Sequence, residues 1–185
     1  MDVKVAIESR RAYRSLEPVQ IDEKVVEELV HAVSLSPSCF NKQPWRMVFV
    51  TDPLVRAKLH ETLNRGNEWF TAASMIIAVF TSKEKDCVIG PREYALFDTG
   101  MATAFLILRA TELGLVAHPI AGFSPEAVKP LLNIPLEENL ITLIGLGKKS
   151  NSASALLNEQ QLKTELERPE RLSRQDWAYR NQMEG

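Results

Sequence analysis

The sequence predicts a single domain, residues 1–185, of the α+β or α/β class, with a central sheet of about four or five strands. Helical patterns and short apolar strand patterns are interleaved along the chain. Residues 72–81 and 140–147 are continuous apolar runs of strand length, as expected for strands buried on both faces. A chain of 185 residues with 45% hydrophobic and 25% charged residues can bury a sizeable core.

Three helices and one strand are expected before the first buried run. Asp22 and Asp52 are candidate N-caps, with Pro53 at the first helical position after Asp52. Pro37 ends the second helix, because the residue before a proline is disfavoured in helical geometry. The expected elements are a short helix from Val3 to about Arg11, a helix over 23–36, a strand over 45–51 and a helix over 53–63.

The second half of the chain continues the alternation. Residues 91–113 form the longest helical pattern, and it is apolar almost all round. Such a helix is expected to be buried on more than one side, both within its own domain and against another subunit. The other expected elements are a loop over 83–90, a strand over 115–121, a helix from Ser124 to Asn133, the strand over 140–147, and a helix plus extended arm from about Ser150.

Charge and cysteine content exclude several classes of protein. The net charge of −2 and pI of about 6.0 argue against a nucleic-acid or anionic-membrane surface as the main partner. The apolar stretch 101–119 is interrupted by Arg109, Glu112 and His118, so no plain membrane span is expected. Cys39 and Cys87 lack paired spacing, which predicts reduced thiols rather than a disulfide or zinc site. The N-terminus lacks a signal-peptide pattern, and a cytoplasmic location is expected.

Three arginines are concentrated near the N-terminus. Arg10, Arg11 and Arg14 stand within about one helical turn. Guanidinium groups bind phosphate through paired hydrogen bonds, so the cluster is a candidate anion site. The alternative is a solvated basic helix end facing its own negative dipole, and charge alone favours that alternative.

Self-contained catalytic motifs are missing from the sequence. The segment 145–150 fails as a phosphate loop, because Thr142 and Lys149 stand where a glycine and a Ser or Thr are needed. No Gly-x-Gly-x-x-Gly fingerprint occurs, and the three histidines show no metal-type spacing, so no metal is expected. If the protein is an enzyme, its chemistry is expected to reside in a cofactor.

Four separated blocks, residues 10–14, 36–45, 98–123 and 133–147, follow one another along the chain. In this order they resemble the FMN-dependent nitroreductase family of flavin oxidoreductases. The second is the most specific, because residues 36–45, Ser-Pro-Ser-Cys-Phe-Asn-Lys-Gln-Pro-Trp, are close to the family's Ala-Pro-Ser-x-x-Asn-x-Gln-Pro-Trp signature. The resemblance implies an α+β fold with a mixed, mostly antiparallel sheet flanked by helices, in an intertwined homodimer. The extension over about 150–185 would pack on the partner subunit.

The resemblance also implies a set of FMN-binding residues. Arg10, Arg11 and Arg14 would hold the phosphate and ribityl chain, while Ala12 stands where the family usually has serine. A basic residue of the tail would complete the phosphate site, Arg171 first and Arg174 second. The remaining expected contacts are Pro37, Ser38, Cys39 and Asn41 along the ring from the other subunit, Asn67 at the pyrimidine side or ribityl chain, and Ile120, Ala121 and Gly122 at the N5 edge.

The activity implied is an NAD(P)H oxidoreductase with a ping-pong cycle. NADH or NADPH would reduce the flavin, and a nitroaromatic, quinone or similar conjugated acceptor would then take the electrons, with no catalytic side chain required. Residues 83–94 and the long helix are expected to influence the choice of acceptor. Two alternatives stay open, namely another flavin reaction on the same fold, such as flavin fragmentation or reductive dehalogenation, and a flavin-binding module with little turnover.

Overall fold

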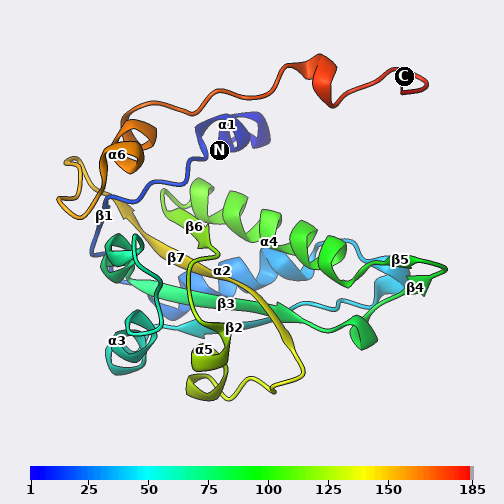
Figure 1. Ribbon diagram of the computed structural model, residues 1–185, viewed down its shortest axis with the longest axis horizontal. Helices are drawn as coiled ribbons and strands as arrows, with labels where there is room; N and C mark the ends of the chain where they lie inside the picture. Colours follow the sequence, from blue (N-terminus) through cyan, green and yellow to red (C-terminus); the bar gives the residue numbers. More distant parts are fainter. Residues whose placement is uncertain (184–185) are drawn as a thin grey trace.

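A five-stranded sheet forms the centre of the molecule (Figure 1). The computed structural model describes residues 1–183. The sheet order is β1-β7-β3-β2, and β6 also pairs with β7. All five strands of this sheet pair antiparallel, which confirms the expected mostly antiparallel sheet; none of the described pairs is parallel. The strands are β1 Leu16–Glu17, β2 Arg46–Val50, β3 Met75–Thr81, β6 Val116–Ile120 and β7 Asn139–Lys149.

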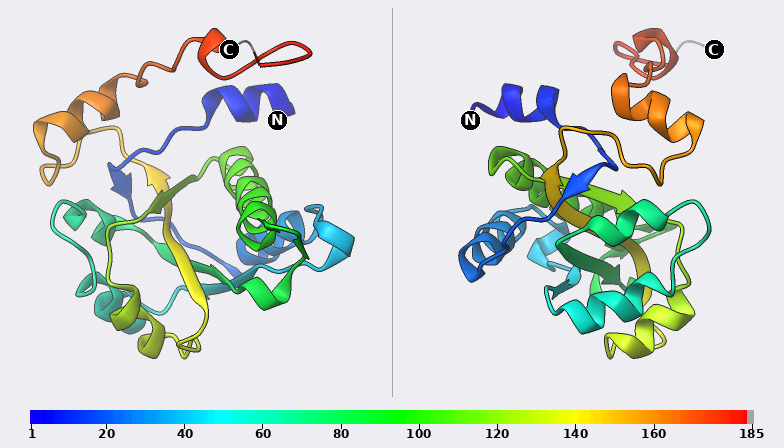
Figure 2. Two further views of the ribbon diagram at one scale, coloured as in Figure 1. Left: turned by 45° about the vertical axis from the view of Figure 1, so that its right-hand side comes forward. Right: turned by 90° about the vertical axis from the view of Figure 1, so that its left-hand side faces the viewer.

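Helices cover both faces of this sheet (Figures 1 and 2). Strand β3 divides the core, because Met75, Ile77 and Val79 pack with α2 and α4, while Ile76 and Ala78 face the opposite cluster that includes residues of α3 and α5. All five side chains are buried, which confirms a strand enclosed on both faces. The helices are α1 Val3–Ser9, α2 Glu23–Ser34, α3 Pro53–His60, α4 Ala95–Glu112, α5 Pro125–Leu131 and α6 Glu159–Leu166.

The helix starts agree with the capping residues in the sequence. Asp22 Oδ1 accepts from the Val25 backbone at 3.0 Å, and Asp52 Oδ1 accepts from the Leu54 backbone at 2.8 Å. Ser124 Oγ caps α5. These side chains satisfy N–H groups that have no partner within their own helix.

The sequence-based assignment differs from the structure in several places, and β3 begins at Met75 rather than residue 72. Strand β1 was not predicted, because two residues are too short to show a strand pattern. A hairpin, β4 Val88–Ile89 with β5 Arg92–Glu93, lies in the region assigned to a loop and to the start of the long helix, so α4 begins only at Ala95. Gly90 has φ +61° and precedes a proline, which makes residues 90–91 the turn of this hairpin. Helix α3 ends at His60 rather than Leu63.

The two cysteines form a disulfide, so the prediction of two reduced thiols is wrong. Cys39 and Cys87 have Cα atoms 6.1 Å apart and are separated by 48 residues in sequence. No local spacing could reveal this pairing, because it results from the packing of two loops at one end of the sheet. The pair ties the loop after α2 to the hairpin before α4.

The C-terminal segment after α6 runs as an extended arm past α1 (Figure 1). It exposes large apolar side chains, including Leu172 (75% exposed) and Trp177 (65%). This agrees with the expected helix plus extended arm. Among the described residues, no helix combines the length and apolarity needed to cross a membrane.

Candidate functional site

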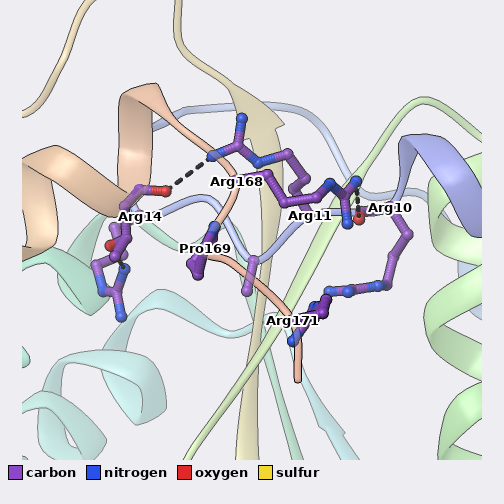
Figure 3. Close-up of a pocket in the computed structure, with 8 residues that line it drawn as sticks. Arg10, Arg11, Arg14, Arg168, Pro169 and Arg171 are labelled. Atoms are coloured by element: carbon purple, nitrogen blue, oxygen red, sulfur yellow. Dashed lines mark hydrogen bonds between the residues drawn. The ribbon is translucent and has the colours of Figure 1, made fainter. Parts of the chain in front are cut away.

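An arginine-lined cavity of about 180 Å³ lies between the segment after α1 and the segment after α6. The cavity includes five predicted site residues, and Figure 3 shows how the arginines from the two segments are gathered around it. The lining residues are Arg10, Arg11, Ala12, Arg14, Thr164, Arg168, Pro169 and Arg171. The solvated helix end that charge alone favoured is therefore not what the structure shows.

Glu165 fastens the two walls of the cavity together. This residue of α6 is 8% exposed, and its carboxylate accepts from the backbone N–H groups of Arg14 at 2.8 Å and Ser15 at 2.9 Å. Each buried N–H would otherwise lack an acceptor. The N-terminal segment is thereby held against the end of α6.

Arg11 and Arg14 contribute to the same attachment. Arg11 Nη2 donates to the carbonyls of Thr164 at 2.8 Å and Glu165 at 3.2 Å, which lie in the C-terminal turn of α6. Arg14 Nη1 donates to Thr164 Oγ1 at 3.1 Å, and its guanidinium lies 5.7 Å from the centre of the Trp69 ring. These two arginines thus hold the cavity wall as well as lining it.

Arg10 has a different environment. Burial lowers the pKa of its guanidinium, and the positive charges of Arg168 and Arg171 lower it further. Burial also lowers the pKa of Arg14, an effect that the Glu165 carboxylate opposes. Within residues 1–183, no carboxylate forms an ion pair with any of the five arginines of the cavity. An excess of positive charge in a concave site favours a bound anion.

A second group of predicted residues meets at the loop after β6. Asn67 Nδ2 donates to the carbonyl of Gly122 at 3.2 Å, and the Asn64 N–H donates to the same oxygen at 3.0 Å. Ile120 is buried at the end of β6, and Ala121 is exposed beside it. Gln161 of α6 donates to the carbonyl of Gly66 at 2.7 Å. Helix α6, which lines the arginine cavity through Thr164, therefore also contacts the segment that carries Asn67.

The loop with Pro37, Ser38, Cys39 and Asn41 has an unusual backbone. Phe40, Asn41 and Gln43 have φ values of 47°, 55° and 50°, in the left-handed region that non-glycine residues rarely adopt. Two hydrogen bonds hold this shape, because Gln43 N–H donates to Ser38 Oγ at 2.9 Å and Cys39 N–H donates to Asp98 Oδ2 at 2.6 Å. Asp98 is 1% exposed, as expected for a buried hydrogen-bonding residue of the long helix.

This loop does not join the other site residues within one chain. Both Figure 1 and the left view of Figure 2 place the segment before β2 beside the β4–β5 hairpin, away from β1 and α6. The structure therefore groups the predicted residues into two sets at opposite ends of the sheet. One set contains the arginines with Asn67 and residues 120–122, and the other contains residues 37–41.

Sequence reasoning missed part of the cavity. Arg168 lines it and donates through Nη2 to the carbonyls of Glu8 at 2.6 Å and Arg10 at 3.1 Å. Arg168 lies three residues before Arg171 and shortly after α6, but this position in the sequence does not indicate that its side chain reaches the cavity. Arg174, the second candidate in the tail, is exposed and is not a lining residue.

A statistical model of the nitroreductase family matches residues 7–148, which include the 10–14 segment, the 37–41 loop and residues 120–122. The chain belongs to the nitroreductase family. The match spans every strand except the end of β7, and the described fold is the α+β nitroreductase fold with an antiparallel sheet flanked by helices.

Individual relatives of this nitroreductase family chain are distant. A protein of Stenotrophomonas maltophilia, provisionally named NADH dehydrogenase/NAD(P)H nitroreductase, is 30% identical over 148 residues, covering 69% of this chain and 76% of the relative. The 5,6-dimethylbenzimidazole synthase of Rhodobacter capsulatus is 27% identical over 165 residues, covering 75% and 79%. A solved oxidoreductase containing FMN superposes with a TM-score of 0.85 at 22% identity, covering 100% and 94%.

Proposed function

We propose that this chain is an FMN-dependent NAD(P)H oxidoreductase that reduces nitroaromatic, quinone or similar conjugated acceptors. The observation that carries the proposal is the cavity lined by five arginines. Among the described residues, no carboxylate forms an ion pair with any of these five. Support for the cofactor and donor comes from the superposed oxidoreductase containing FMN and from the relative named for NAD(P)H.

The cavity fits the phosphate group of FMN. Arg10 has two cationic neighbours whose charges lower its pKa, and a dianion would remove that repulsion. Arg168 and Arg171 would add donors from the other wall. Ala12 contributes no hydroxyl, so the grip would depend on guanidinium groups. When bound, FMN would supply hydride and electron transfer, while the chain positions it and stabilises its charge.

The remaining predicted residues would lie along the rest of the cofactor. Asn67 keeps its side-chain oxygen available, because only its nitrogen is used to hold Gly122. The exposed backbone at Ala121 could approach the reactive edge of the ring. Residues 37–41 would cover the ring from a second copy, since in their own chain they lie at the opposite end of the sheet (Figure 2).

A homodimer would bring the two sets of residues together. An apolar groove of about 460 Å³ between α1, α2 and α4 includes Val3, Leu35 and Phe105, which are 69%, 64% and 40% exposed. The outer face of α4 also exposes Phe97, and the arm exposes Trp177. Exposed apolar surface of this extent marks an interaction site, and a second copy is the partner that would also complete the flavin site. The 150–185 extension would then pack on the partner subunit.

FMN titration with arginine variants tests the proposal. Wild-type protein should bind FMN, and NADH or NADPH should bleach its visible absorbance under anaerobic conditions. Arg10→Ala and Arg171→Ala should each weaken FMN binding by about 1.5–3 kcal/mol, the range for hydrogen bonds to charged groups. Arg174→Ala is the matched control and should bind like wild type. Wild-type affinity in both cavity variants would show that the phosphate binds elsewhere, and bound FMN that neither donor bleaches would favour a flavin-binding module.

Another reaction of the flavin itself is an alternative on the same site. The Rhodobacter capsulatus relative named 5,6-dimethylbenzimidazole synthase is the observation that favours it. Reduced FMN should be incubated with the protein in air and the products separated by chromatography. Recovery of intact FMN with rapid turnover of quinones supports the oxidoreductase, whereas loss of FMN with negligible quinone turnover supports the alternative.

A further inference from the structure

The Cys39–Cys87 disulfide joins the loop assigned to the flavin ring with the hairpin before α4. Cys39 lies in the loop with three left-handed residues, and Cys87 directly precedes β4. The two sulfurs are the only cysteine sulfurs of the chain; Cys39 is half-buried and Cys87 lies deeper, so a reductant would reach the disulfide from the Cys39 side. A partly exposed disulfide is accessible to a dithiol.

The hairpin has few other attachments to the body of the protein. Strands β4 and β5 have two residues each, and all four residues are exposed. Lys83 and Glu93 form an ion pair at 2.5 Å, but both side chains are more than half exposed, where such pairs contribute little. Lys85 pairs with Glu138 at the base of the segment. The disulfide is thus the covalent attachment of a segment with little buried apolar surface, and such segments open readily.

The other side of the disulfide is attached firmly. The Cys39 N–H donates to Asp98 Oδ2 at 2.6 Å, and Asp98 is buried in the first turn of α4. The Asp86 carboxylate accepts from the Cys87 N–H at 2.7 Å, but this contact lies within the hairpin segment and does not attach Cys87 to the rest of the protein. Cleaving the S–S bond would therefore leave Cys39 in place and release mainly the hairpin side.

We propose that the Cys39–Cys87 disulfide is a thiol–disulfide exchange site whose reduction frees residues 83–94 from the 37–41 loop. A thiolate of an external dithiol attacks one sulfur and breaks the S–S bond, giving a mixed disulfide. The second thiol of the reductant then displaces the protein sulfur. The dithiol loses two electrons and ends as a cyclic disulfide, while the two cysteines gain two electrons and two protons. We expect reduction also to make the flavin site more accessible to electron acceptors, and this consequence rests on the proposed function.

Thiol counting and hydrogen exchange test, without using flavin activity, whether the disulfide holds residues 83–94 to the 37–41 loop. The purified full chain, treated with diamide, should show no thiol reactive with an aromatic disulfide reagent, and two per chain after dithiothreitol. Amide exchange in residues 83–94 should accelerate about tenfold on reduction, with β3 unchanged. Cys87→Ser should exchange like reduced wild type under both conditions. Two reactive thiols after diamide, or identical hairpin exchange in the two states, would overturn the proposal.

Turnover measurements then test the consequence for access. Dithiothreitol is first removed under argon. The kcat/KM for a bulky quinone should then be several-fold higher in reduced wild type than in the diamide-treated form. The kcat/KM for ferricyanide should rise less. Cys87→Ser should show the reduced-type values in both treatments. Equal kcat/KM for the quinone in the two redox states would refute control of access. Failure to bind FMN would refute the proposed function. The thiol and exchange results would still decide whether the disulfide holds residues 83–94 in place.

Discussion

The side-chain amide of Asn67 occupies the space that a side chain at residue 122 would need. A Cβ added to Gly122 would stand 2.2 Å from Asn67 Nδ2, far inside contact distance. In the structure that nitrogen donates to the Gly122 carbonyl at 3.2 Å. Glycine at position 122 thus leaves room for this close approach, which couples two predicted flavin contacts that are 55 residues apart in sequence.

Replacing Gly122 with alanine should displace Asn67. The Cβ would push the amide away and break its hydrogen bond to the residue 122 carbonyl, while the Asn64 N–H could keep donating. Because the displaced group is the end of a flexible side chain, the free energy of unfolding should fall by only about 1 kcal/mol. FMN affinity should fall with it. Urea denaturation and FMN titration measure the two effects.

Gly100→Ala is the matched control. Gly100 lies within α4, and an added Cβ would meet nothing within 4 Å. Alanine in a helix interior is more favourable than glycine, so this variant should gain up to about 1 kcal/mol of stability. Equal stability of the Gly122→Ala variant and wild type would show that Asn67 is not held at this position.

Variants of Arg10 and Arg11 should have different effects on phosphate binding and on the free energy of unfolding. Arg11 donates to two carbonyls of α6, so Arg11→Ala should lower the free energy of unfolding by about 1–2 kcal/mol. Arg10 faces the like charges of Arg168 and Arg171, so Arg10→Gln should leave stability in phosphate-free buffer unchanged or raised. In phosphate buffer the wild type should gain more stability than Arg10→Gln. Urea denaturation in the two buffers tests this, and a stability loss for Arg10→Gln without phosphate would contradict it.

Most of the fold could be predicted because its signals are local. Asp22, Asp52 and Ser124 cap their helices as the sequence indicates, and the apolar run of β3 is buried on both faces. Strand β1 could not be predicted, because its two residues pair only with the distant end of β7. The hairpin at 88–93 was hidden in the same way, since its exposed residues show no apolar alternation.

The grouping of the candidate site residues could be anticipated from the sequence only in part. Three arginines stand in one turn at 10–14, but their charge alone favoured a solvated helix end, and only the resemblance to the nitroreductase family implied a phosphate site there and at Arg171. Arg168 and Glu165 could not be assigned, because their roles depend on α6 lying against the N-terminal segment. The Cys39–Cys87 disulfide was missed for the same reason.

His118 should make the protein less stable in mild acid. Burial, as the largest cause, and the charges of Arg14 and Arg10 lower the pKa of its imidazole from 6.5 to about 4, although its Nδ1 contact with the Tyr13 carbonyl and the Glu165 carboxylate oppose this. A lowered pKa means that the folded state disfavours the proton. The contribution of the neutral His118 to the free energy of unfolding is therefore fully present above pH 6.5. It is lost as the pH falls from 6.5 to 4, and the total loss is about 3 kcal/mol.

Denaturation at several pH values between 7 and 4 measures this effect. His118→Phe keeps a ring beside Trp69, whose ring centre lies 4.5 Å from that of His118, but it cannot be protonated. That variant should be less stable at pH 7, because the Tyr13 carbonyl loses its 3.0 Å contact, and should lose less stability on acidification. His31→Phe, at an exposed position of α2, is the control. Identical pH dependence in wild type and His118→Phe would refute the assignment.

Glu165 should be the main attachment of α6 and of the arm that follows it. Glu165→Ala removes the acceptor of two backbone N–H groups, those of Arg14 and Ser15, and at least the second is in a buried residue. Unpaired buried groups of this kind cost about 1–3 kcal/mol each, so the free energy of unfolding should fall by about 2–4 kcal/mol. Glu165→Gln keeps one acceptor oxygen and should lose less. Because α6 would detach locally, trypsin should cleave after Lys163 within α6 and after Arg171 faster in Glu165→Ala; Arg168 precedes a proline and is not a trypsin site. Glu167→Ala, an exposed change at the end of the same helix, should be cleaved like wild type. Unchanged cleavage in Glu165→Ala would show that Arg11 and Arg14 suffice to hold this wall of the cavity.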